Sequence, residues 1–218
     1  YHPDQPLVKE PNLQHKVVHD IDYAGLFDKA ENMSQGFCIC ATPDGYRMFI
    51  HQPITTGGTT RIVETIFNPE GDNENPAVIA FSQELHDIGH QSIGCVYEDG
   101  KVKLYTTTED YKGYNIIQWK GSDTSDIDIT RKEIFKDGFF AGDKAVTLAI
   151  SSDAKHLLIE SAGENNNAYY NNDDKRVISL FDRAAYDAGN NAFIRMFTIP
   201  KADVIGDAFQ GLACANKY

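Results

Sequence analysis

The residues best suited to chemistry lie in the segment HDIGHQ at positions 86–91. His86 and His90 are four residues apart and Asp87 follows the first. On a helix this spacing puts two imidazoles on one face, where they can hold a metal ion, as in H-E-x-x-H. Here a glycine interrupts the spacing and a strand is expected to start at Gln91, which indicates a loop. We expect these four side chains to have a structural or hydrogen-bonding role first and a ligand-binding role second, with no metal.

A second candidate site consists of two loops rich in tyrosine, asparagine and aspartate, DYKGY and ENNNAYYNNDD. Tyrosine rings stack on sugar rings, and amide and carboxylate groups satisfy sugar hydroxyls. The loops therefore predict a glycan-binding surface formed by Tyr111, Tyr114, Tyr169 and Tyr170. The alternative is a soluble surface loop whose tyrosines are partly buried in the sheets. Calcium binding is less favoured, because the acidic cluster lacks the spaced ligands of an EF-hand.

Composition and charge exclude several classes of protein. Among the 218 residues, 20 Lys and Arg stand against 32 Asp and Glu, and the formal net charge of −12 disfavours binding to nucleic acid. No apolar run is long enough to span a membrane, and the first residues lack the layout of a signal peptide. The first residue is not Met, so we expect the chain to begin inside a precursor, a trimmed protein or an engineered chain.

Four cysteines are too few and too irregularly spaced to indicate a disulfide scaffold: Cys38, Cys40, Cys95 and Cys214. Cys38 and Cys40 form C-x-C in an apolar run, where alternate side chains of a strand point to the same side. They are predicted to be small buried side chains. A zinc site is less favoured, because no CxxC or HxxxH pattern accompanies them.

The strongest signal for the fold is an internal repeat. Residues 36–50, 91–105 and 144–159 each contain two short alternating apolar segments around an aspartate. These aspartates, Asp44, Asp99 and Asp153, are 55 and 54 residues apart. A small residue lies four positions before each of them: Cys40, Cys95 and Ala149. A fourth copy opens near residue 209. A repeat of this length predicts a repeated structural unit.

Each repeat continues with a polar loop and two more strand-like segments. Strands are expected at 61–68, 115–121 and 176–183, and again at 77–84, 128–135 and 192–200. Four short antiparallel strands about every 55 residues are typical of a β-propeller blade. We therefore predict an all-β, propeller-like fold over residues 36–218, with about three blades and the start of a fourth. A β-sandwich is the alternative, and FDRAAYDAGNN could form one short helix ended by its glycine.

The visible blades are too few to close a ring. We expect the natural protein to continue beyond Tyr218, or another chain or the N-terminal segment to complete the ring. Residues 1–35 are predicted to be an arm outside it. The loops that enter the blades would gather at one mouth of the central channel, and Asp143 and Asp207 would lie there beside the histidine loop.

The segment GHQSIGCVYEDGKVKLYTTTEDYKGYNIIQWK at 89–120 resembles a blade of the β-propeller modules in bacteriophage tail and receptor-binding proteins. The residues that carry the resemblance are Gly89, His90, Gln91, Gly113, Tyr114, Ile116 and Trp119. The glycine usual between the histidine and glutamine is missing here, and the other repeats lack the entry motif. The resemblance implies a homo-oligomer, normally a trimer, in a virion tail or outside the cell.

Three functions are compatible with these features. The first is a non-catalytic attachment module without a cofactor that binds a bacterial surface polysaccharide. The second is an enzyme, either a propeller-fold glycan hydrolase or lyase or a metal-dependent lactonase-like hydrolase, although no G-x-S-x-G, P-loop or Rossmann motif is present. A glycosidase needs two facing carboxylates, whose separation a sequence does not give. The third is a structural connector in a larger assembly.

Overall fold

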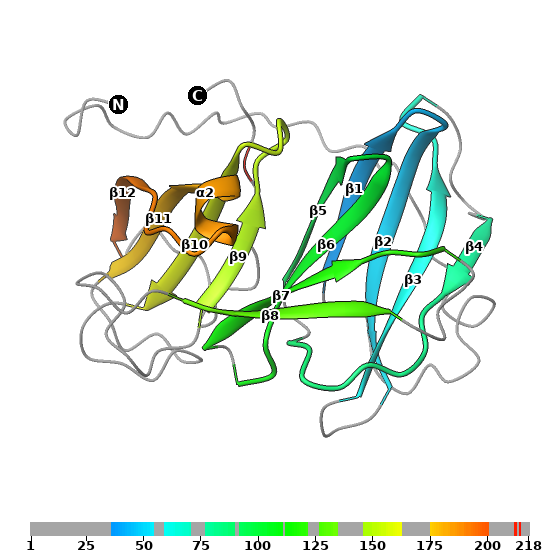
Figure 1. Cartoon of the computed structure of the whole chain (residues 1–218), viewed down its shortest axis with the longest axis horizontal. Coiled ribbons are helices and arrows are strands. Elements are labelled where there is room, and N and C mark those ends of the chain that lie inside the picture. The colour runs from blue at the N-terminus through cyan, green and yellow to red at the C-terminus, as the bar shows by residue number, and fades with distance from the viewer. Residues whose placement is uncertain are drawn as a thin grey trace.

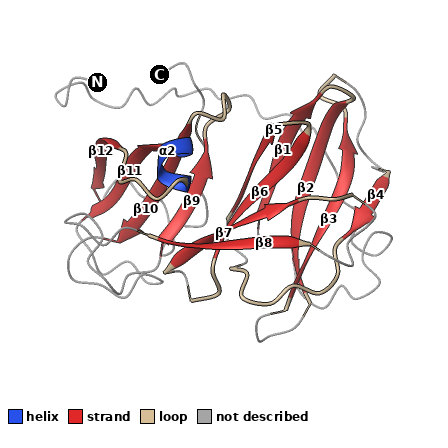
Figure 2. Cartoon of the chain, viewed as in Figure 1, coloured by secondary structure: helices blue, strands red, loops and turns tan. Residues whose placement is uncertain are grey.

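The computed structural model has an all-β architecture, with one short helix among the described residues (Figure 1 and Figure 2). Its strands form three four-stranded antiparallel sheets, each made of four consecutive strands in chain order. The predicted four-stranded antiparallel units are thereby confirmed. The structure describes residues 36–54, 59–70, 77–89, 92–110, 112–121, 127–134, 146–162, 175–200, 212 and 214.

The strands follow the repeat in the sequence. The first sheet contains β1 (Gly36–Thr42), β2 (Gly45–Pro53), β3 (Thr60–Phe67) and β4 (Val78–Phe81). The second sheet contains β5 (Ile93–Glu98), β6 (Lys101–Thr107), β7 (Gly113–Gln118) and β8 (Asp128–Glu133). The third sheet contains β9 (Val146–Ile150), β10 (His156–Ala162), β11 (Lys175–Asp182) and β12 (Phe193–Pro200).

Tight turns join the first two strands of each sheet, where the sequence repeats its aspartate. In the second sheet Asp99 and Gly100 both have a positive φ, 55° and 77°, as a type I′ hairpin turn requires. Gly45 and Ala154 have the positive φ at the other two turns, 114° and 61°. The repeated aspartates therefore mark the hairpins, as the sequence predicts.

An apolar seam joins the first sheet to the second. Phe49 and Ile62 of the first sheet and Leu104 and Ile117 of the second are fully buried in one cluster. Trp119, just after β7, meets the Phe49 ring edge-on with the ring centroids 5.5 Å apart. Burying one side chain of this size stabilises a fold by about 1.5–3 kcal/mol. This seam therefore contributes much of the stability that holds the two sheets together.

A second seam joins the second sheet to the third and is rich in tyrosine. Tyr105 and Tyr114 of the second sheet pack with Leu157 and Phe181 of the third, and all four are buried. Tyr186, from the helix after β11, closes the cluster with its ring centroid 4.5 Å from that of Phe181. The tyrosine hydroxyls are polar groups buried in this seam, so they need hydrogen-bond partners there.

The helix α2 (Arg183–Asp187) follows β11 directly. Asp182 caps its first turn, because its side chain accepts a hydrogen bond from the backbone N–H of Ala185 at 2.9 Å. Gly189 has a φ of 89° just after the helix, a conformation that ends helices and suits glycine. The short helix predicted for this segment is confirmed.

The first strands of the three sheets are neighbours: β1 lies beside β5, and β5 beside β9 (Figure 1). A Cβ atom on Gly94 would lie 2.7 Å from Cγ1 of Ile150, so the approach of β5 to β9 depends on this glycine. The backbone of Cys214 forms a parallel bridge to Ser151 at the end of β9. The described residues thus form three sheets with adjacent first strands, whereas a β-sandwich has two sheets.

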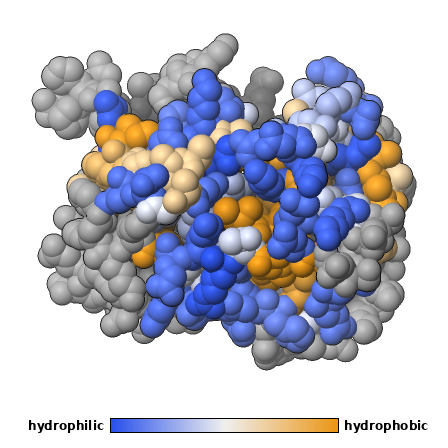
Figure 3. Space-filling view, viewed as in Figure 1, coloured by the Kyte–Doolittle hydropathy of each residue, from blue (hydrophilic) through white to orange (hydrophobic). Residues whose placement is uncertain are grey.

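Some predicted segments lie outside the described residues. These are the N-terminal arm at 1–35 and the entry loops that carry Asp143 and Asp207. On the face drawn in Figure 3, polar and charged side chains surround smaller apolar patches. Within the described ranges, no helix has the length and hydropathy needed to cross a membrane.

Candidate functional site

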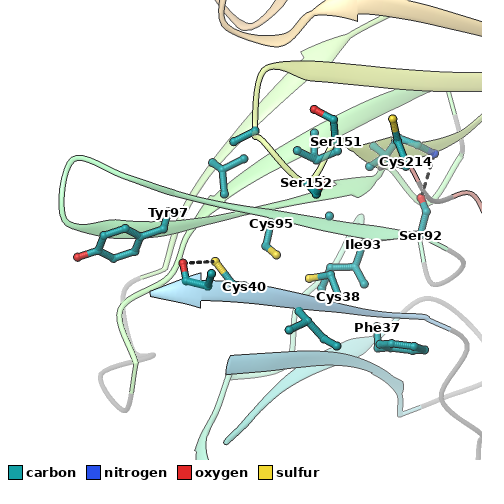
Figure 4. Close-up of a pocket in the computed structure, with 18 of the residues that line it drawn as sticks. Phe37, Cys38, Cys40, Ser92, Ile93, Cys95, Tyr97, Ser151, Ser152 and Cys214 are labelled. Carbon is teal, nitrogen blue, oxygen red and sulfur yellow. Dashed lines mark hydrogen bonds between the residues drawn. The ribbon is translucent and has the colours of Figure 1, made fainter. Parts of the chain in front are cut away.

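A cavity of about 870 Å³ lies where the first strands of the three sheets meet (Figure 4). Its walls come from residues 36–41 of the first sheet, 92–97 of the second and 148–154 of the third. Leu212 and Cys214 complete the lining. Because each sheet contributes its first strand, the repeat itself builds this cavity.

The walls combine apolar side chains with a few polar groups. Ile39 and Ile93 are among the apolar lining residues, and Ser92 and Ser151 are among the polar ones. The Ser92 hydroxyl also accepts a hydrogen bond from the backbone N–H of Leu148 at 3.4 Å, which ties the second sheet to the third. A largely apolar concave surface with a small number of polar groups is typical of a ligand-binding site.

Two tyrosines and an aspartate lie near the hairpin turns that border this cavity. Tyr46 and Tyr97 are among its lining residues and are 44% and 39% exposed. Asp153 Oδ1 accepts hydrogen bonds from the Ser151 hydroxyl at 2.7 Å and from the backbone N–H of Lys155 at 3.1 Å. These bonds hold the pKa of Asp153 below its usual value, so it is a carboxylate at neutral pH. The cavity therefore combines exposed aromatic rings with a hydrogen-bond acceptor.

The histidine loop lies against the second sheet through Asp87. This residue has a φ of 60°, and its carbonyl accepts a hydrogen bond from the Asn115 side chain at 2.8 Å. Its carboxylate forms an ion pair with Arg131, which also approaches Asp110 at 3.4 Å. Both carboxylates and the guanidinium are roughly half exposed. Exposed ion pairs add little to the free energy of unfolding, so the main effect of these pairs is to hold the loop in place.

The glycine of this loop is packed tightly. Gly89 is buried, and its N–H donates to the carbonyl of Thr107 at 2.7 Å. A Cβ on Gly89 would lie 2.7 Å from the carbonyl oxygen of Thr108, so no larger residue fits without a shift. His86 is exposed on the surface, and His90 and Gln91 lie outside the described residues. Asp87 and Gly89 thus make structural contacts, and the ligand-binding role of the loop stays a prediction.

The tyrosines expected on a glycan-binding surface are not brought together in the described part of the chain. Tyr114 is 1% exposed and lies in the seam between the second and third sheets, so its ring is not available at the surface. Tyr111, Tyr169 and Tyr170 lie outside the described residues. Of the four, Tyr114 thus has the partly buried position named as the alternative, and the other three stay predictions.

A buried polar network crosses the seam between the second and third sheets. Arg183 donates to Glu98 at 2.8 Å, to the Tyr105 hydroxyl at 2.8 Å and to Asp187 at 3.2 Å. Asp187 also accepts hydrogen bonds from the hydroxyls of Tyr105 at 2.6 Å and Tyr114 at 2.9 Å. Arg183 is only 6% exposed, and its charge is compensated by Asp187 and by the partly exposed Glu98.

The pKa values of the network follow from this geometry. Hydrogen bonds from Lys103 and then Arg183 lower the pKa of Glu98 to about 2. Burial and the neighbouring Asp187 carboxylate raise the pKa of Tyr105 and of Tyr114 well above the usual range, so both hydroxyls remain donors. At neutral pH Glu98 and Arg183 are therefore ionised and the two tyrosine hydroxyls are neutral donors, and the network acts as a clamp between the second and third sheets.

No family model matches the chain, and no curated protein matches it. Among the residues that the structure describes, no three His, Cys, Asp or Glu side chains are grouped to hold a metal ion. None of the four cysteines, all of which the structure describes, forms a disulfide. The site must therefore be interpreted from its own geometry.

Sequence analysis did not select the tyrosines that line the cavity. Tyr46 lies two residues after the repeated aspartate of the first sheet, and Tyr97 lies two residues before that of the second. An aromatic residue beside a repeated turn was the available signal. This signal indicates a binding site only together with the structure, which places both turns beside one cavity.

Proposed function

We propose that the three sheets are consecutive blades of a β-propeller, and that the protein is a non-catalytic attachment module that binds a cell-surface glycan in the cavity between its first strands. The observation that carries the proposal is the pair of exposed rings of Tyr46 and Tyr97 on a cavity that Ser152 and Asp153 also line.

Three features support propeller geometry. Each sheet uses four consecutive antiparallel strands, as a propeller blade does. The first strands lie side by side and line one cavity, which is the position of the inner strands around a propeller channel. Leu212 and Cys214 pack on the third sheet against Ala149, Leu158 and Ile178, where the first strand of a fourth blade would lie.

The chemistry of the cavity suits a sugar. A tyrosine ring offers a flat apolar face to the C–H face of a pyranose and keeps a polar hydroxyl at its edge. The Asp153 carboxylate and the Ser152 hydroxyl can accept hydrogen bonds from sugar hydroxyls. The formal net charge of −12 favours a neutral glycan over an acidic one, because like charges repel.

The source of the glycan is proposed from the sequence. Residues 89–120 resemble modules of bacteriophage tail and receptor-binding proteins, which supports a bacterial surface polysaccharide as the ligand. A virion-tail or extracellular location and a trimeric assembly are part of the same proposal. The loop tyrosines Tyr111, Tyr169 and Tyr170 are candidates for further contacts with a long polysaccharide.

Binding to an array of bacterial surface glycans, followed by titration of the best oligosaccharide, tests the proposal. We expect Tyr97→Ala to weaken that affinity about ten-fold, because the loss of one stacked ring at a binding site costs about 1–2 kcal/mol. Tyr46→Ala should have an effect of similar size. Isothermal titration calorimetry measures both.

The matched control is Phe193→Ala, which removes an aromatic ring that is 38% exposed on β12 and does not line the cavity. Its affinity should equal that of the wild type. Equal affinity of Tyr97→Ala and Phe193→Ala for the oligosaccharide would rule out the cavity as the glycan site, and the absence of any array signal would count against a glycan ligand.

A further inference from the structure

All four cysteines of the chain line the one cavity. Cys38 and Cys40 lie two residues apart on β1 and therefore point to the same side of that strand, toward the second sheet. Cys95 lies on the neighbouring first strand, β5. Figure 4 shows the three side chains turned toward one another between the two strands. Two sheets thus bring three thiols together, although 57 or 55 residues separate them in the sequence.

The pKa values of two thiols reflect this grouping. The neighbouring Cys95 thiol and burial raise the pKa of Cys40, and the neighbouring Cys38 thiol and burial raise the pKa of Cys95. The Cys40 thiol donates a hydrogen bond to the carbonyl oxygen of Ala41 at 3.9 Å.

Access differs among the three thiols. Cys40 is 3% exposed, whereas Cys38 and Cys95 are only partly buried at the cavity wall. A small molecule that enters the cavity therefore meets Cys38 and Cys95 first. Oxidation needs an accessible sulfur, and the raised pKa of Cys95 disfavours its thiolate, so the attack is assigned to Cys38.

We propose that Cys38 and Cys95 are an oxidation site, at which a peroxide that enters the cavity produces a reversible disulfide between the first and second sheets. In the first step the Cys38 sulfur, after losing its proton, attacks one peroxide oxygen. The O–O bond breaks, Cys38 becomes a sulfenic acid, and the second oxygen leaves as water.

In the second step the Cys95 sulfur attacks the sulfur of Cys38 and releases its proton. The S–O bond breaks, a second water leaves, and the disulfide forms. The two sulfurs together give up two electrons, which reduce hydrogen peroxide to two molecules of water. A thiol such as dithiothreitol or glutathione reverses the reaction by exchange. The cross-link does not depend on glycan binding, since neither sulfur is needed for the contacts proposed for Tyr46 and Tyr97.

Peptide mapping without reductant, after incubation of the whole chain with hydrogen peroxide, tests this site. We expect one linked peptide pair, Cys38 with Cys95, a loss of two hydrogen atoms in the intact mass, and full reversal by dithiothreitol. Cys95→Ser should abolish the link and leave a sulfenic acid on Cys38 that dimedone traps.

Two further variants separate the roles of the other thiols. Cys38→Ser should abolish the linked pair, whereas Cys214→Ser, at the same cavity but outside the group of Cys38, Cys40 and Cys95, should leave the yield of the pair unchanged. A Cys40–Cys95 link in the wild type would overturn the proposal, and so would irreversible sulfinic acid on Cys38 with no cross-link. The mapping of the wild type decides between these results even if a variant fails to fold.

Discussion

Replacing Arg183 with methionine should lower the free energy of unfolding by about 3 kcal/mol, because removing one partner of a buried ion pair leaves the other charge uncompensated. Methionine fills much of the same volume, so the loss reports mainly on the charge and its hydrogen bonds. Asp187 would retain the hydroxyls of Tyr105 and Tyr114 but lose its only cation among the ion pairs of the described residues. Urea denaturation followed by circular dichroism measures the change.

Arg131→Met is the matched control, since the Arg131 side chain is 47% exposed and pairs with surface carboxylates. Exposed ion pairs contribute about 0–1 kcal/mol, so this variant should unfold near the wild-type urea concentration. Equal losses for the two variants would show that the buried network does not act as the clamp between the second and third sheets.

Replacing Trp119 with alanine should lower the free energy of unfolding by about 3–5 kcal/mol, as is usual when a large aromatic side chain is removed from a core. The Trp119 indole packs edge-on against Phe49 in the seam between the first two sheets. Its N–H also donates to the Glu64 carboxylate at 2.7 Å, and Glu64 is only 7% exposed. The truncation therefore leaves both a cavity and a buried carboxylate without this donor.

Two further variants serve as comparisons for the stability loss of Trp119→Ala. Trp119→Phe keeps most of the apolar contact and removes only the N–H donor, so we expect a smaller loss of about 1–3 kcal/mol. Ile129→Ala, which truncates a 38% exposed side chain on β8, should change stability by less than about 1 kcal/mol. A Trp119→Ala loss no larger than that of Ile129→Ala would contradict the account of the first seam.

The sheets were predictable because their signals are local. Alternating apolar residues and an aspartate at each turn recur at nearly constant spacing, and Asp99 and Gly100 have the backbone that such a turn needs. The helix after β11 was also local, with Asp182 as its cap and Gly189 at its end. These features depend on neighbours in sequence, so one sequence is enough to find them.

The site was less predictable because its parts are distant in sequence. Tyr114 ends a segment with the composition of a sugar-binding loop, yet strand β7 turns its side chain into the seam, where Asp187 accepts a hydrogen bond from its hydroxyl. The alternation of apolar and polar residues along one strand does not show which face of that strand packs against another sheet. The partners of Arg183 and the cluster of Cys38 with Cys95 depend on how the sheets pack, which no local pattern specifies.

The resemblance to phage modules is carried partly by structural residues. A Cβ on Gly113 would lie 2.7 Å from the carbonyl oxygen of Lys132, and Tyr114 and Trp119 are buried in the two seams. Such residues are needed to build a four-stranded sheet that packs on both faces. Their roles explain a resemblance in the sheet and carry no information about the ligand. The proposal of a glycan ligand therefore rests on the cavity.

A crystal structure of the chain with the oligosaccharide selected on the array tests the central claim most directly. The account predicts a sugar ring stacked on Tyr97 or Tyr46, inside the cavity between β1, β5 and β9, with a hydroxyl bonded to Asp153. A sugar bound at the histidine loop around His86, or anywhere away from the first strands, would contradict it.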